Sequence, residues 1–300
     1  MKLIEPSVTQ IIQNLGLKGI FQQIERAGRL CYKSEDKITE DSAEKFVNML
    51  IEKKHYAMLE HGTVYLMVES PNDENYFDSL CHYKWNPYST YSILTTLTNY
   101  KRVCVTTNYR VIIENNWLDD LKYLCEPTPY HQKRYTFHFI TSIGITREII
   151  RHRHMSFANE STRYCNYGKD KFDSEITFIK PQWANIKEIT KENKVKLSDG
   201  LSSWFNPNYI HVYGLNIPSK WFMKACLEAE YSYLHMINEQ NMKPQEAREV
   251  LPMCTKSEII VTGFESDWID FLRLRCAKDA HPDIQYLANK VKENFPIAIY

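Results

Sequence analysis

Apolar residues at helical spacing predict the first clear helix of the chain. Within residues 40–55, apolar side chains from Phe46 to Ile51 recur every three or four positions, which is typical of a helix with one buried face. Asp41 and Glu44, three residues apart just before this run, resemble a capping box at the start of that helix.

Further elements follow from the same pattern. Residues 63–70 and 134–140 predict strands, and residues 219–240 predict a long helix with apolar side chains along one side. Pro244 is expected to open the next helix, because proline is tolerated in a first turn.

Residues 72–133 differ in character from their surroundings, being rich in Tyr, Asn and Thr. The β-rich runs 101–107 and 109–115, separated by Asn108, predict a short hairpin, and residues 116–124 predict a short helix. We identify no catalytic or ligand-binding motif in this segment, so we interpret it as an elaboration of the fold.

The order of these elements predicts an α+β protein whose C-terminal half is mainly helical. Regular βαβα alternation is missing, and no G-x-G-x-x-G motif follows a strand, so the fold is not expected to be a Rossmann fold. A dinucleotide, if one binds, would lie outside such a site. Three hundred residues can form a continuous core, and we expect a single domain over 1–300.

Composition narrows the possible partners. The hydrophobic fraction of 43% and the charged fraction of 25% are typical of a soluble globular protein. Lys+Arg and Asp+Glu both number 37, which argues against a large nucleic-acid surface, since such binding depends on phosphate neutralisation. Eight cysteines without a C-x-x-C pair, no signal peptide and no long apolar run predict a cytoplasmic protein with reduced thiols that does not enter a membrane.

Residues 151–164, RHRHMSFANESTRY, contain side chains suited to anion binding. Asn159, Ser161 and Arg163 are two apart, so in an extended segment all three would project from one face. An amide, a hydroxyl and a guanidinium on one face can hydrogen-bond an anionic ligand from several directions.

The first part of this stretch adds two guanidinium groups. Arg151 and Arg153 supply forked donors suited to phosphate, and they are expected to lower the pKa of His152 between them. A solvated basic turn is the alternative interpretation. Phe157 and Tyr164 favour a packed segment instead.

A second unusual pattern lies in WIDFLRLR. Trp268, Phe271 and Leu272 form an apolar stripe, and the next position of that stripe is Arg275. Its guanidinium either extends to water or needs an anionic partner, since an unpaired buried charge is costly. Arg248, in AREVLP, raises the same question.

The segment HYAMLEH contains two histidines and a carboxylate, His55, Glu60 and His61, which suggests a metal site. The histidine spacing does not match i, i+4 ligation on a helix, and no Cys or Asp lies nearby. We therefore expect no metal here.

Together these motifs resemble those of the flavin-dependent thymidylate synthases. Arg151-His152-Arg153, seven residues and then Ser161 match the R-H-R-x7-S signature of that family. Other segments resemble its remaining motifs in the same order, namely ERAGRLCYKS, HYAMLEH, AREVLP and FLRLR. The resemblance covers about 20–70 and 134–290 and makes 72–133 an insertion.

The resemblance implies an antiparallel sheet flanked by long helices, and a homotetramer with active sites between subunits. It further implies reductive methylation of dUMP to dTMP, with 5,10-methylenetetrahydrofolate as the carbon donor and tetrahydrofolate as the second product. FAD, reduced by NADPH, would supply the hydride.

The resemblance also assigns roles to residues. Arg275 would be catalytic, because a fixed cation stabilises uracil deprotonated at N3 and makes its C5 more nucleophilic. Arg163 would take the phosphate together with Arg248 of another subunit. The dUMP site would comprise Glu148, Arg151, Asn159, Ser161, Thr162, Arg163, Arg248 and Arg275. The FAD site would comprise His55, Ala57, Glu60, Arg151, His152, Arg153, Asn159 and Asp270.

Several positions depart from the family pattern. Phe264 and Ser266 stand where the family often carries an Asn and an Arg facing FAD, and Asp270 replaces a frequent Asn. Asn159 occupies a position that is often Glu or Gln. No cysteine has an activating setting and no base lies near Ser161 in the sequence, so we assign Ser161 to binding.

Other functions fit parts of the pattern. A metal-dependent nucleotide phosphohydrolase could use His55, Glu60, His61 and His154, and metal content against flavin absorbance would separate the two enzymes. An RNA-binding module could use the basic stretch with surface tyrosines. A third alternative is a family homologue that no longer holds flavin.

Overall fold

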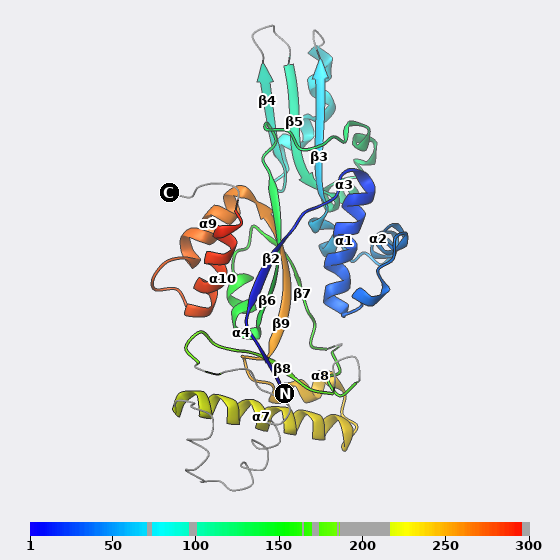
Figure 1. Cartoon of the computed structure of the whole chain (residues 1–300). Helices are drawn as coiled ribbons and strands as arrows, with labels where there is room; N and C mark the ends of the chain where they lie inside the picture. Colours follow the sequence, from blue (N-terminus) through cyan, green and yellow to red (C-terminus); the bar gives the residue numbers. More distant parts are fainter. Residues whose placement is uncertain are drawn as a thin grey trace.

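The computed structural model describes residues 1–70, 74–95, 101–163, 165–169, 174–184, 186 and 217–295 (Figure 1). Its centre is a four-stranded sheet with the strand order β2-β6-β9-β7, in which every neighbouring pair is antiparallel. The strands are β2 (Ser7–Ile11), β6 (Arg134–Ser142), β7 (Ser156–Asn159) and β9 (Lys256–Phe264).

Helices cover both faces of this sheet, because its two longest strands present a different set of side chains on each side. Phe137 and Phe139 of β6 pack against Trp268 and Phe271 on one face, whereas Thr136 belongs to the opposite face. The first face carries α4 (Ile143–Ile149), α9 (Glu265–Arg275) and α10 (Pro282–Glu293). The other carries α1 (Gly16–Tyr32) with α2 (Ser42–Glu52) beside it. The predicted α+β class and the antiparallel sheet flanked by helices are confirmed.

A second sheet extends beyond the first and has the antiparallel order β3-β5-β4 (Figure 1). It consists of β3 (Thr63–Ser70), β4 (Thr90–Thr95) and β5 (Lys101–Asn108), with α3 (Tyr109–Glu114) and the 3₁₀ segments η3 (Glu74–Trp85) and η4 (Leu118–Tyr123). Most of the segment 72–133 belongs to this sheet and its connections. Its origin as an insertion stays a prediction.

Two local predictions were wrong. The run 109–115 forms the helix α3 and not the second strand of a hairpin, because the Asn108 side chain accepts a hydrogen bond from the Val111 amide at 3.2 Å and caps the helix. At the start of α2, Asp41 makes no capping hydrogen bond. The Ser42 hydroxyl instead accepts from the Thr39 amide at 2.9 Å.

Beyond the end of the central sheet that lies opposite the second sheet are α7 (Ile217–Asn238), α8 (Pro244–Ala247) and the 3₁₀ turn η6 (Arg248–Val250). The predicted helix at 219–240 and the opening role of Pro244 are confirmed. Nearby, β1 (Lys2–Ile4) and β8 (Thr177–Ile179) form the one parallel pair among the described strands. Within the described residues, no helix is both long and apolar enough to span a bilayer.

Candidate functional site

Arg275 lies at the end of α9, where its guanidinium is held by α4 and by the turn that follows α4. Trp268, Phe271 and Leu272 are almost completely buried, which fixes the helix against the sheet. Arg275 donates from Nη1 to Glu148 Oε2 and from Nη2 to the Glu148 carbonyl, both at 2.9 Å. The sequence pattern left open whether this guanidinium extends to water or has an anionic partner, and in the structure that partner is Glu148.

His152 completes this cluster. Its Nε2 accepts a hydrogen bond from Arg275 Nε at 3.0 Å, so the ring hydrogen belongs on Nδ1. Burial, followed by the Arg275 charge, lowers the pKa of His152 to about 4, against a smaller opposing effect of Asp270. The lowered pKa agrees with the prediction, but its causes are burial and Arg275 and not the adjacent arginines. His152 is therefore neutral over the usual pH range.

The flanking arginines occupy the turn between α4 and β7. Arg151 and Arg153 are exposed, and the Met155 amide donates to the His152 carbonyl at 3.0 Å to close the turn. Two guanidinium groups therefore face solvent on either side of a neutral imidazole that packs edge-on against Phe271. This arrangement can receive an anionic group.

The predicted alternation of the signature residues on one face holds only as far as Asn159. β7 ends there, opposite Ile259 of β9, and the chain then turns. The Ser161 amide donates to the Cys31 carbonyl at 3.2 Å, and Thr162 and Arg163 lie in a turn. We call Ser161–Arg163 the signature turn. Tyr164 lies outside the described residues.

Arg248 contacts the signature turn from η6. Its Nη1 donates to the Thr162 hydroxyl at 3.0 Å within the same chain. No second subunit is needed to bring this arginine to Thr162. Asn159 is held separately, since its Oδ1 accepts from the Ser257 hydroxyl at 3.2 Å.

A buried ionic cluster anchors the signature turn, and sequence reasoning missed it. The Glu160 carboxylate is fully buried and lies 2.9 Å from Lys256 Nζ and 3.8 Å from Lys33 Nζ. Both lysines also contact Glu258, whose second oxygen lies 2.8 Å from His138 Nε2. Lys256 and Glu258, two apart at the start of a strand that continues into the apolar run Ile259–Val261, were the one sequence signal that pointed to these partners.

Charges within this cluster stabilise one another. Burial alone raises the pKa of Glu258, but the His138 hydrogen bond and both lysines outweigh it and hold the pKa well below its ordinary value. Burial alone would lower the pKa of Lys33, but Glu160 and Glu258 raise it instead. Lys33 and Glu258 are therefore charged across the neutral pH range, and the contact of Glu160 with Lys256 ties the residue before Ser161 to β9.

The segment expected to contact flavin, 55–61, packs on the other face of the sheet as η2 (Tyr56–His61). His55 and Ala57 are exposed, and the Glu60 carboxylate accepts from Arg110 Nη1 at 2.6 Å. These residues are therefore not in one cluster with Arg275. Asp270 is exposed and pairs with Arg273 at 3.0 Å.

His61 has a structural setting. It is completely buried, its Nδ1 lies 2.8 Å from the Thr262 hydroxyl, and burial, followed by the Arg134 charge, lowers its pKa to about 3. Among the described residues, no three His, Cys, Asp or Glu side chains are grouped so that they could hold a metal ion.

The fold and site define an α+β protein in which Arg248 contacts the turn after β7 and Arg275 is held by Glu148 and His152. The family model described as thymidylate synthase complementing protein, Thy1, matches residues 92–297. The chain therefore belongs to the Thy1 family.

Curated relatives include two flavin-dependent thymidylate synthases. The protein of Corynebacterium efficiens is 29% identical over 159 residues, which cover 52% of this chain and 56% of that protein. The protein of Mycobacterium tuberculosis is 27% identical over 155 residues, which cover 50% and 53%. The chain thus spans about half the length of the curated relatives it matches.

Two solved structures share a distant likeness. Thymidylate synthase X from Helicobacter pylori with FAD and dUMP is 14% identical, with a TM-score of 0.39 over 97% of this chain and 93% of that one. The UMP/dUMP methylase PolB from Streptomyces cacaoi bound with 5-Br UMP is 15% identical, with a TM-score of 0.42 over 98% and 91%. TM-scores below 0.5 establish neither a shared site nor a shared ligand.

Proposed function

We propose that this chain is a flavin-dependent thymidylate synthase that methylates dUMP to dTMP. Membership of the Thy1 family supports the proposal. The observation that carries it is the held guanidinium of Arg275, which contacts Glu148 and His152 beside an arginine-rich turn. A rigid cation is the group that would stabilise negative charge on a pyrimidine ring.

Arg275 can bind substrate without giving up its protein partners. Three of its five N–H donors are used by Glu148 and His152, which leaves two for a ligand. Its side chain is 18% exposed, so a ligand can reach it. Held in this way, the cation lowers the pKa of the uracil N3–H and increases the electron density at C5.

The phosphate of dUMP is assigned to the signature turn. Arg248 lies against Thr162 there, and Arg163 follows in the same turn. Guanidinium groups match phosphate oxygens in geometry and charge, and hydroxyls of Ser161 and Thr162 can donate as well. Glu160 fixes the turn through Lys256, so these donors would need little reorganisation on binding.

We further propose FAD as cofactor, 5,10-methylenetetrahydrofolate as carbon donor and NADPH as reductant. The donor set fits the anionic part of a dinucleotide, since Arg151 and Arg153 are exposed on both sides of the neutral His152. Bound FAD would supply the hydride that completes the methyl group. To contact FAD, Glu60 would have to give up its ion pair with Arg110, and Asp270 its ion pair with Arg273.

Active sites between the subunits of a homotetramer also belong to this proposal. The residues assigned to FAD occur on both faces of the central sheet, with 55–60 on one and His152 on the other. A second copy could bring the two groups together.

An assay of dTMP formation tests the proposed function. Purified protein is incubated with dUMP, methylenetetrahydrofolate, NADPH and FAD, and each component is omitted in turn. We expect dTMP only in the complete mixture. Release of inorganic phosphate from dUMP with a divalent metal, without dTMP, would instead indicate the phosphohydrolase.

A further inference from the structure

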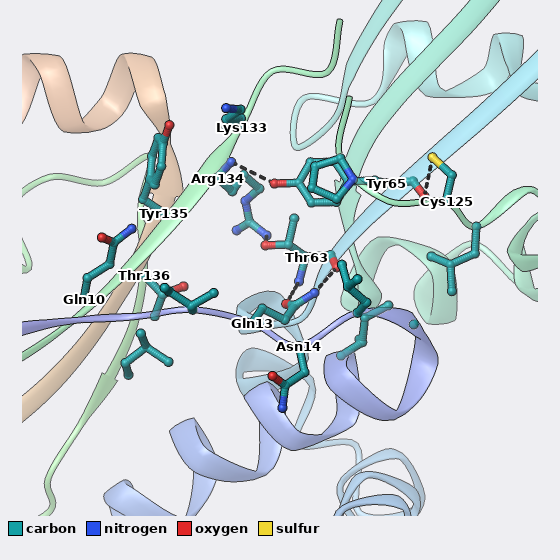
Figure 2. Close-up of a pocket in the computed structure, with 17 residues that line it drawn as sticks. Gln10, Gln13, Asn14, Thr63, Tyr65, Cys125, Lys133, Arg134, Tyr135 and Thr136 are labelled. Atoms are coloured by element: carbon teal, nitrogen blue, oxygen red, sulfur yellow. Dashed lines mark hydrogen bonds between the residues drawn. The ribbon is translucent and has the colours of Figure 1, made fainter. Parts of the chain in front are cut away.

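The start of β6 lines a cavity of about 250 Å³ where the two sheets meet (Figure 2). Its walls come from residues 10–16, from β3, from 124–127 and from 133–136. None of the residues assigned above to dUMP or FAD lines it. The Gln13 side chain exchanges two 2.8 Å hydrogen bonds with the Thr63 backbone, which ties two of these walls together.

Arg134 brings a positive charge to this cavity without a carboxylate partner. Its Nη1 and Nη2 both donate to the Glu60 carbonyl at 3.1 Å, and Nη1 lies 3.3 Å from the Thr63 hydroxyl. Among the described residues, no carboxylate oxygen lies within 4.0 Å of this guanidinium, and its buried Nε finds no acceptor. The nearby Glu60 carboxylate is already bound to Arg110.

This charge persists at neutral pH. Burial lowers the pKa of Arg134 to about 10, so the side chain stays protonated although its environment disfavours the cation. The groups that accept its hydrogen bonds are neutral, and the Glu60 and Asp267 charges, which act to raise its pKa, do not offset the effect of burial. A contact with the Phe264 ring, whose centroid lies 5.4 Å from the guanidinium carbon, compensates only in part.

Other groups around the cavity suit an anion with an apolar part. The Tyr65 hydroxyl accepts from the Arg134 amide at 3.3 Å, and its own hydrogen has no acceptor among the described residues (Figure 2). Lys133 adds a second, exposed cation at the rim. Ile11 and Leu124 provide apolar wall.

We propose that this cavity binds a small organic anion whose carboxylate or phosphate group lies against Arg134. Its volume lies just below the ~300–1,000 Å³ of pockets that hold a whole drug-sized ligand, which favours a small molecule or one end of a larger one. The shared chemistry is an oxyanion with a short apolar portion. Either a free anion or the diphosphate of a dinucleotide supplies it.

Calorimetric titration of the full chain with inorganic phosphate and with benzoate, at constant ionic strength, tests the proposal. Arg134→Met keeps the length of the side chain and removes the charge, so we expect affinity for both probes to fall about tenfold or more. Arg134→Lys should retain part of it. Lys122→Met removes an exposed charge that does not line the cavity and should change nothing.

Equal affinities of the wild-type protein and Arg134→Met would overturn the proposal. It would also be overturned if neither phosphate nor benzoate binds the wild-type protein at about 10 mM. If circular dichroism shows that Arg134→Met is unfolded, Tyr65→Phe replaces it, because this change removes one hydroxyl only. We then expect phosphate binding to weaken about threefold to tenfold. An unchanged affinity would count against the site.

Titration of FAD-saturated protein separates the two sources. Phosphate that still binds with the same affinity identifies a site for a free anion. Pyrophosphate that competes with FAD but not with riboflavin identifies the dinucleotide as the ligand, provided Arg134→Met weakens the binding of FAD and leaves that of riboflavin unchanged. Both results are independent of dTMP formation, so they stand even if the proposed enzyme activity fails.

Discussion

The Nε of Arg275 donates to Nε2 of His152 at 3.0 Å, which requires that the imidazole be neutral. Glu148, in α4, pairs with the same guanidinium, so a carboxylate, a cation and a neutral ring form one unit. This unit joins the end of α9 to the turn between α4 and β7. It therefore couples the proposed catalytic group to the proposed cofactor site.

Removal of this cation should abolish catalysis and spare flavin binding. We expect Arg275→Ala to reduce dTMP formation by about 10²-fold or more, because a preorganised charge that faces the reacting ring is lost. FAD absorbance of the purified variant should match that of wild type. Arg273→Ala, which removes an exposed arginine two residues earlier, is the control and should turn over normally. Full turnover of Arg275→Ala would exclude its catalytic role.

The depressed pKa of His152 predicts acid sensitivity. The folded-state pKa of about 4 lies below the ordinary value of about 6.5, so between these values the unfolded chain binds more protons. The stability contributed by the neutral ring is complete above pH 6.5 and is lost as pH falls toward 4. NMR titration of the imidazole should give the low pKa, and Arg275→Ala should raise it. An ordinary titration near 6.5 in wild type would contradict the proposed contact.

The buried carboxylate of Glu160 should matter more than its position between two signature residues suggests. Glu160→Gln leaves Lys256 with Glu258 alone and Lys33 with Glu258 and the more exposed Glu35, and breaking a buried ion pair in this way costs roughly 3–5 kcal/mol. Glu35→Gln removes a 39% exposed partner of Lys33 and should cost about 1 kcal/mol or less. Urea unfolding measures both free energies. Similar small losses would show that the cluster does not anchor the turn.

Local patterns in the sequence predicted elements better than they predicted the site. The strands at 63–70 and 134–140 and the helix at 219–240 were read correctly, because each depends on side chains close in sequence. The run at 109–115 was misread, since β-branched residues fit either element and the Asn108 cap decides for helix.

Site contacts over long sequence separations could not be predicted in this way. Glu160 meets Lys256 across 96 residues, and Arg275 meets Glu148 across 127. The position of Arg275 on an apolar stripe suggests that its charge has a partner, but the sequence does not identify the partner residue. The alternation of Asn159, Ser161 and Arg163 failed for a related reason, since the pairing with β9 that keeps the strand extended ends at Asn159.

Arg163 should act on substrate binding and not on the chemical step. Arg163→Ala removes a charged donor from the signature turn, so we expect the Kd for dUMP to rise about tenfold or more. At saturating dUMP, kcat should stay within a few-fold of wild type, because the phosphate lies away from the reacting carbon. Calorimetric titration of dUMP gives the first value and initial rates give the second. An unchanged Kd would remove Arg163 from the phosphate site.

Mixed oligomers can show which residues share a subunit within one active site. Arg248 reaches Thr162, and Arg275 reaches Glu148, each within one chain, so we expect each pair to enter a site from the same protomer. If a site between subunits takes the Arg163–Arg248 pair from one copy and the Arg275–Glu148 pair from another, co-expression of Arg163→Ala with Arg275→Ala should restore about a quarter of the sites, those that draw each arginine from an unaltered copy. Arg163→Ala with Arg248→Ala should restore none, because every site lacks one of the two. Activity in the mixture of Arg163→Ala with Arg248→Ala would place these two arginines of one site on different subunits. No activity in the mixture of Arg163→Ala with Arg275→Ala would place Arg163 and Arg275 of one site in the same chain.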